Sequence, residues 1–192
     1  ADTMPDSLDL YMLQDLTGSF KDDIRKIRGD QDDSSDSSDL GILDDLVTGM
    51  NELIPDTQYG MGYFKDPVKG FDSSGTRDGL IHDLDMQADN DGSYLDGKEG
   101  GWTQVNGQWV QVEGSGYDSY EANGGQGGNP EEDQITALND VAEAAINNNL
   151  GFRDGVQKVV IIATDATADT SAAEIAECAA NLEAANMIPV FL

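Results

Sequence analysis

Basic residues, cysteine and histidine are scarce in this chain of 192 residues. Lys and Arg together number 10 against 38 Asp and Glu, so the formal net charge is −28. A surface of this sign repels nucleic acid and anionic lipid and attracts cations, so we expect neither of the first two as a partner. The single cysteine excludes an internal disulfide framework. The single histidine, His82, lacks neighbouring nitrogen or sulfur ligands in the sequence and does not indicate a zinc site.

Long apolar runs are absent as well. No run approaches the roughly 20 residues that a transmembrane helix needs, so we expect no membrane insertion by this segment. The first residues, ADTMPDS, lack the basic and apolar regions of a signal peptide, although a trimmed chain would look the same. Apolar residues still make up 38%, and strand and helix patterns alternate. These features predict one α/β domain over residues 1–192 that is large enough to bury a core.

An apolar run that ends in oxygen donors is the most informative feature of the chain. Residues 8–13 suit a buried parallel strand, and Asp15, Thr17 and Ser19 then alternate outward at its carboxyl end. One carboxylate and two hydroxyls so closely spaced form a hard oxygen set, which suits Mg²⁺ or Ca²⁺ better than zinc. The stretch therefore predicts a strand that delivers a divalent-cation site.

Two further carboxylates, Asp22 and Asp23, follow this stretch. They open a helical pattern, and in the first turn of a helix the dipole favours negative charge with or without an ion. A helix-terminal role and a second cation site are therefore both open for this pair. The overall acidity is ambiguous in the same way, because a solvated acidic surface explains it as well as a set of cation sites does.

The pattern D-x-T-x-S after a strand resembles the metal-ion-dependent adhesion site (MIDAS) of von Willebrand factor A (VWA) domains. Over the string DLYMLQDLTGSFKDD the chain is similar, nearly position for position, to integrin β subunits, including the trailing Asp pair. The resemblance implies an α/β fold with a doubly wound, Rossmann-like, mostly parallel sheet and helices on both faces. It also implies that Asp15, Thr17 and Ser19 hold one ion and that Asp22 and Asp23 hold an adjacent Ca²⁺.

A second strand that ends in an acid, residues 156–165, is similar to the family strand that ends in T-D-A or T-D-G. In a doubly wound sheet, ligands gather at the carboxyl ends of the strands where the strand order reverses. The family fold places these two strands side by side at that point. The resemblance therefore adds Asp165 to the primary ion site.

A glycine-rich element before the helix pattern of residues 135–145 looks like the GG-D-x-PE element of the same family. Aligned from the helix side, Glu132 takes the position of a glutamate shared between two ion sites, and Asn129 replaces a metal-binding Asp. Aligned on the Pro-Glu pair, Glu131 is the shared glutamate instead. We prefer Glu132 because the helix register is the firmer guide, and the amide of Asn129 puts a third cation site in doubt.

Residues 66–128 are rich in Gly, Asp and Ser, and we interpret them as an insertion into the domain. Within them, Asp89 and Asp91 belong to a run that resembles part of an EF-hand loop. The run lacks the carboxylates that the first and twelfth positions of that motif require. An accessory Ca²⁺ site at this pair is therefore a separate prediction from the primary site.

The clearest local structure in the same region is a hairpin. Asn-Gly at positions 106 and 107 lies between two alternating runs, which is the strongest short hairpin signal. Pairing around this turn puts Trp102 and Trp109 on one face, where they either cover a small core or form a binding surface. In integrin β subunits the corresponding region carries the loop that tunes ligand specificity.

The function that the resemblance implies is adhesion through a metal ion. We expect Mg²⁺ or Ca²⁺ to keep one open coordination position and to accept there an Asp or Glu carboxylate from a protein ligand, at the cell surface or outside the cell. The alternative is a structural, Ca²⁺-stabilised module of a large secreted protein. No general base pair or nucleophile motif supports an enzyme. Family members continue with a further helix, strand and closing helix, so the chain looks like a domain that is incomplete at its C-terminus.

Overall fold

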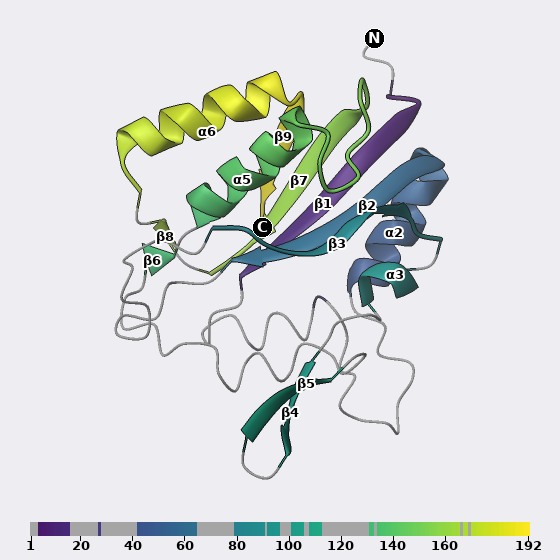
Figure 1. Cartoon of the computed structure of the whole chain (residues 1–192). Helices are drawn as coiled ribbons and strands as arrows, with labels where there is room; N and C mark the ends of the chain where they lie inside the picture. Colours follow the sequence, from purple (N-terminus) through teal and green to yellow (C-terminus); the bar gives the residue numbers. More distant parts are fainter. Residues whose placement is uncertain are drawn as a thin grey trace.

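The computed structural model describes residues 4–15, 27, 42–64, 79–90, 92–96, 101–105, 108–112, 131–132, 134–165, 167–168 and 170–192. The architecture is α/β, with a mixed and mostly parallel sheet of five strands in the order β3-β2-β1-β7-β9 (Figure 1). These strands are β1 (Ser7–Asp15), β2 (Asp56–Phe64), β3 (Ile81–Ala88), β7 (Gln157–Ala163) and β9 (Met187–Phe191). The helices are α2 (Ile42–Leu53), α3 (Ser93–Asp96), α5 (Gln134–Ile146) and α6 (Ala172–Ala184). This arrangement is compatible with a Rossmann-like fold.

Strand β1 lies at the centre of the sheet. It pairs in parallel with β2 on one side and with β7 on the other. Every residue from Leu8 to Asp15 is buried, as expected for a parallel strand that has neighbours on both edges. The predicted strand over residues 8–13 is therefore confirmed, and its apolar run explains its central position.

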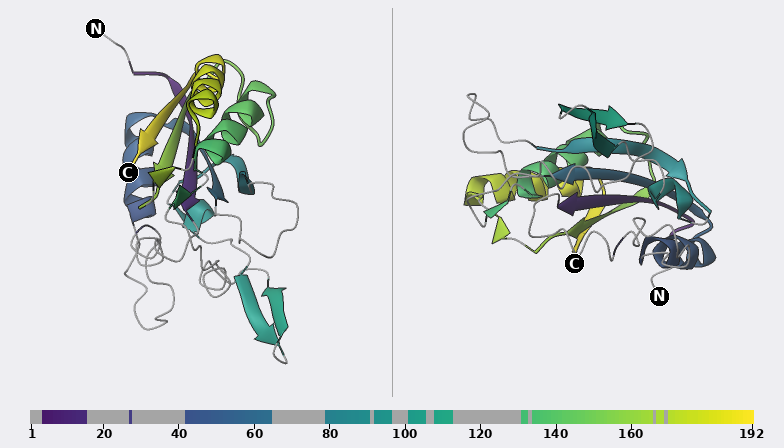
Figure 2. Two further views of the ribbon diagram at one scale, coloured as in Figure 1. Left: turned by 90° about the vertical axis from the view of Figure 1, so that its left-hand side faces the viewer. Right: turned by 90° about the horizontal axis from the view of Figure 1, so that it is seen from below.

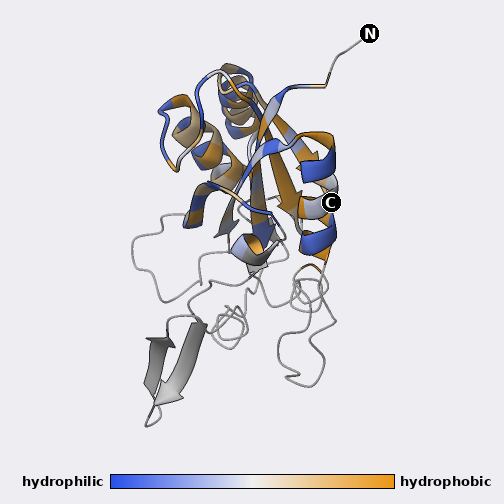
Figure 3. Cartoon of the chain, turned by 90° about the vertical axis from the view of Figure 1, so that its right-hand side faces the viewer, coloured by the Kyte–Doolittle hydropathy of each residue, from blue (hydrophilic) through white to orange (hydrophobic). Residues whose placement is uncertain are grey.

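Residues that alternate along β1 belong to two different buried clusters. Leu8, Leu10 and Met12 pack in one cluster with Leu43 and Val47 of α2. The other cluster combines residues of the opposite parity on β1 with α5 and α6, and includes Tyr11, Leu13, Leu138, Val141, Cys178 and Leu182. Figure 2 shows these helices beside the twisted sheet, and Figure 3 shows that hydrophobic residues concentrate along the central strands. Cys178 is buried in this second cluster, and burial raises the pKa of its thiol.

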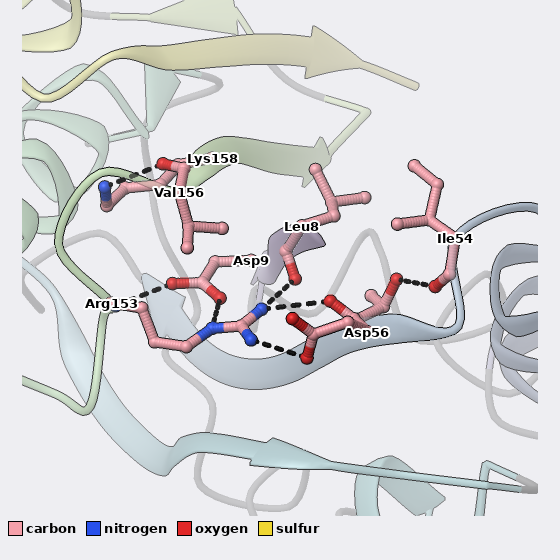
Figure 4. A network of polar contacts seen from close by, with 8 residues as sticks. Leu8, Asp9, Ile54, Asp56, Arg153, Val156 and Lys158 are labelled. Carbon is pink, nitrogen blue, oxygen red and sulfur yellow. Dashed lines mark hydrogen bonds and ion pairs between the residues drawn. The ribbon is translucent and has the colours of Figure 1, made fainter. Parts of the chain in front are cut away.

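A polar network joins the beginnings of β1 and β2 to the loop before β7 (Figure 4). The Asp9 carboxylate is fully buried and accepts hydrogen bonds of 2.7 Å from both the backbone N–H and the Nε of Arg153. The same guanidinium donates to the Asp56 carboxylate at 2.7 Å and to the Leu8 carbonyl at 2.8 Å. Burial alone would lower the pKa of Arg153, but the hydrogen bonds to Asp9 and Asp56 outweigh it and raise the pKa.

Strand β3 was not predicted. It lies inside residues 66–128, the region interpreted as an insertion, and it pairs antiparallel with β2 at the edge of the main sheet. Its sequence, IHDLDMQA, carries two aspartates and a histidine, as edge strands often carry charge on their exposed positions. That polarity made the segment resemble an acidic loop, and only the pairing identifies it as a strand.

The predicted hairpin is confirmed. Strands β4 (Gly101–Val105) and β5 (Gln108–Val112) form an antiparallel pair separated by positions 106 and 107. The register opposes Trp102 to Gln111 and Gln104 to Trp109, so both tryptophan positions fall on one face of the ribbon.

Among the described residues, no helix is long and apolar enough to cross a membrane.

Candidate metal-binding site

The carboxyl ends of β1 and β7 lie next to each other. The two strands are paired in parallel, with Gln14 opposite Ala163, so Asp15 and Thr164 follow at the same edge of the sheet. The chain places β2 and β3 on one side of β1 and places β7 and β9 on the other side. The strand order therefore reverses between β1 and β7, which is where open α/β sheets bind their ligands. The predicted adjacency of these two strands is confirmed.

Asp15 is the buried carboxylate at this edge. Its residue is 0% exposed, and Thr164 Oγ1 donates a hydrogen bond of 2.8 Å to its Oδ2. A carboxylate removed from water needs polar partners, because burying an uncompensated charge is costly. The contact with Thr164 supplies a dipole at one oxygen and adds no positive charge. Asp165, the next residue along the chain, is exposed.

A short parallel ladder brings a third predicted segment to the same loop. Strand β6 (Glu131–Glu132) pairs with β8 (Thr167–Ala168), which begins two residues after Asp165. One alignment of the glycine-rich element selects Glu132 and the other selects Glu131, and both residues lie in β6. The preference for Glu132 therefore stays a prediction. Segments that are far apart in the sequence are thus connected around the end of β7.

Several predicted ligands lie outside the described residues. These are Thr17, Ser19, Asp22, Asp23, Asp91 and Asn129. Within the part of the chain that the structure describes, no group of at least three His, Cys, Asp or Glu side chains is close enough to hold a metal ion. The described acids at this edge, Asp15 and Asp165, offer oxygen donors only, which is the chemistry that Mg²⁺ and Ca²⁺ prefer. The chemistry of these residues is compatible with such an ion, and the whole ligand set stays a prediction.

Asp89 has a different environment from Asp15. Its residue is 4% exposed, and its carboxylate accepts hydrogen bonds from the backbone N–H groups of Gly92, Tyr94 and Leu95 at 3.0, 3.2 and 3.3 Å. These donors belong to the turn and the first residues of α3, so the carboxylate caps that helix. The cap accounts for the burial of Asp89. The accessory Ca²⁺ site stays a prediction, and an ion there would compete with the capping hydrogen bonds for the same carboxylate.

Sequence reasoning missed a hydrogen-bonded chain that involves the single histidine. The buried Tyr11 hydroxyl lies 2.9 Å from His82 Nδ1, and His82 Nε2 lies 2.8 Å from the Asp85 carboxylate. The sequence feature that could have pointed to this contact is Gly60. A Cβ added there would lie 3.0 Å from the Tyr11 ring and 2.6 Å from the sulfur of Met86. The glycine lets the ring cross β2 to reach β3, which is a packing role.

A groove of about 780 Å³ lies at the opposite edge of the sheet, between α2 and the beginnings of β1, β7 and β9. Its lining is mostly apolar and includes Met4, Leu8, Met50, Val159 and Ile188. A ligand site usually adds a few convergent polar groups to such a surface. Asp6 and Gln157 are the polar residues in the lining, so the edge that carries Asp15 is the better candidate for a metal.

No protein-family model and no curated protein matches the chain. Among solved structures, the chain is similar to proximal thread matrix protein 1 (PTMP1) from the mussel byssus, with 14% sequence identity and a TM-score of 0.53. The similarity covers 100% of this chain and 38% of that protein's chain. At this level of identity the likeness concerns the fold alone.

Proposed function

We propose that this chain is a ligand-binding module that acts through a divalent cation at the carboxyl edge of its sheet. The observation that carries the proposal is the position of Asp15, a buried carboxylate at the end of the central strand where the strand order reverses. The excess of acidic residues supports it, because a net charge of −28 raises the local concentration of cations. Mg²⁺ or Ca²⁺ is the ion that an all-oxygen donor set would hold.

In the proposed site, Asp15, Asp165 and Glu132 supply carboxylates, and Thr17 and Ser19 supply hydroxyls. Neutral hydroxyls leave the ion electrophilic, whereas a full cage of carboxylates would satisfy its charge. The bound ion would supply Lewis acidity at one open coordination position. There it would accept the carboxylate of an Asp or Glu from a protein ligand.

The fold and the family belong to the same proposal. We infer a doubly wound sheet with helices on both faces, of the VWA type found in integrin β subunits, with an adjacent Ca²⁺ at Asp22 and Asp23. The division of the core into an α2 cluster and an α5–α6 cluster supports this inference. An adhesion role at the cell surface or outside the cell, without enzymatic activity, follows from the resemblance.

The experiment is a calorimetric titration with Mg²⁺, followed by a ligand assay. Wild-type protein is compared with Asp15→Asn and with Asp154→Asn, which removes the same charge from an exposed position remote from the edge. We expect Asp15→Asn alone to lose Mg²⁺ binding. In the presence of Mg²⁺, the wild type should then retain peptides with one central Asp and not the matching Asn peptides. Equal Mg²⁺ affinity in all three proteins would contradict the site.

The second candidate function is a structural module that Ca²⁺ stabilises without binding a ligand. The observation that favours it is the surplus of 28 negative charges, which repel one another until ions bind. In that case millimolar Ca²⁺ should raise the melting temperature more than NaCl of equal ionic strength does, while no carboxylate-bearing peptide is retained. Retention of the Asp peptides would favour the first function over this one.

A further inference from the structure

The contact between Thr164 and Asp15 joins two residues that are 149 positions apart in the sequence. Thr164 directly follows β7 and is half-buried, and its hydroxyl donates to Oδ2 of the fully buried Asp15 at 2.8 Å. Because the two strands are paired up to Gln14 and Ala163, the two residues that follow them lie at the same edge of the sheet. The hydroxyl therefore restrains the rotation of the carboxylate.

We propose that Thr164 is a positioning residue for the cation at Asp15, and this inference rests on the proposed function. A carboxylate that binds a metal ion is commonly held by a hydrogen bond from a group that does not touch the ion, and losing such a bond typically lowers metal affinity about 10- to 100-fold. The Thr164 hydroxyl suits this role because it is neutral. It orients Asp15 and adds no positive charge of its own, whereas a guanidinium in the same place would compensate the carboxylate.

The other buried carboxylate of β1 supports this distinction between a neutral and a cationic partner. Asp9 has the same parity as Asp15 along β1 and is also 0% exposed, but its partner is the Arg153 guanidinium. An ion pair of this kind neutralises the carboxylate and serves the fold. At the other end of the strand, the Thr164 hydroxyl orients the Asp15 carboxylate and itself adds no positive charge.

The test compares Thr164→Val, Thr164→Ser and Thr57→Val with the wild type by Mg²⁺ calorimetry and by thermal unfolding without divalent ions. Thr57 is a matched control, because its buried hydroxyl donates a 2.6 Å hydrogen bond to the Ile54 carbonyl at the opposite edge of the sheet. We expect Thr164→Val to weaken Mg²⁺ binding about 10- to 100-fold. Thr164→Ser, which keeps the hydroxyl, should stay close to wild type. Thr57→Val should lower the melting temperature and leave Mg²⁺ affinity unchanged.

The outcomes separate this inference from the function on which it rests. If the wild type binds Mg²⁺ and Asp15→Asn does not, but Thr164→Val binds as the wild type does, the positioning role is wrong and the proposed function stands. If Thr164→Val and Thr57→Val lose Mg²⁺ affinity equally, Thr164 acts only through stability, and the inference is overturned. A wild type that binds no divalent ion would overturn both.

Discussion

Each end of β1 carries a buried aspartate, and the two aspartates have different hydrogen-bond partners. Asp9, at the beginning of the strand, is bound by the backbone and the guanidinium of Arg153, which also reaches Asp56 and Leu8. Asp15, at the end of the strand, receives a hydroxyl hydrogen bond from Thr164. Both residues are 0% exposed, so burial alone does not identify a functional acid. The contacts that the structure describes differ in charge, with a guanidinium at Asp9 and a threonine hydroxyl at Asp15.

The largest effect should come from breaking the ion pair at the Asp9 end. Arg153→Ala leaves a buried carboxylate uncompensated, and such changes typically cost about 3–5 kcal/mol of unfolding free energy. Urea denaturation measures this loss. Adding Asp9→Asn to the variant should recover part of it, because the orphaned charge is removed. Mg²⁺ affinity should not change, and a cost below about 1 kcal/mol would show that this network is not a main support of the fold.

At the Asp15 end, the same kind of change should affect ion binding more than folding. Asp15→Ala should weaken Mg²⁺ binding by more than the roughly 100-fold that marks the upper range for residues outside the ligand set. Its melting temperature without divalent ions should stay close to that of the wild type, because the apolar residues of β1 do not depend on the ion. If Asp15→Ala instead unfolds the protein and Mg²⁺ affinity is unchanged in the milder Asp15→Asn, the contrast between the two ends fails.

Tyr59 is a buried ionisable residue on the other face of the sheet, and its hydroxyl has a neutral hydrogen-bond partner. Its hydroxyl donates to Asn51 Oδ1 at 2.9 Å, and burial raises its pKa from 10.0 to about 12. Because the folded state disfavours the phenolate, this stabilisation is complete below pH 10 and is lost as the pH rises towards 12. The loss should reach roughly 3 kcal/mol, because each pKa unit corresponds to a little over 1 kcal/mol.

Urea denaturation of the wild type and of Tyr59→Phe between pH 9 and pH 12 measures this loss, with each pH fixed by buffer. The phenylalanine variant lacks the ionisable group, so its stability should fall less over this range. Parallel curves for the two proteins would mean that the folded state tolerates the Tyr59 phenolate.

The smallest expected effect concerns the acids that follow the strand. If Asp22 and Asp23 only favour the helix dipole, replacing both with Asn should cost on the order of 1–2 kcal/mol with or without Ca²⁺. If they hold a second ion, the double variant should lose one Ca²⁺ equivalent in calorimetry and most of the Ca²⁺-dependent stabilisation, while Mg²⁺ still binds at Asp15. A titration with unchanged Ca²⁺ stoichiometry would exclude the adjacent site and leave the broader VWA proposal standing.

The sequence by itself determined the elements whose signals are local. The apolar run of β1, the helical pattern of α5 and the Asn-Gly signal between β4 and β5 each specify one element, because periodicity and turn chemistry act over a few residues. The acid at the end of each of two buried strands was also visible in the sequence. Their adjacency followed from the resemblance and was confirmed by the pairing of β1 with β7.

The tertiary structure decided the partners. Asp9 and Arg153 are 144 residues apart, and Asp15 and Thr164 are 149 apart. Strand β3 forms through its antiparallel pairing with β2. The local pattern singles out Asp15 by the hydroxyls at positions 17 and 19, but it does not show what contacts either acid. The register between parallel strands places a guanidinium beside Asp9 and a hydroxyl beside Asp15. Register depends on long-range pairing, so only the folded chain shows which side chain lies beside each acid.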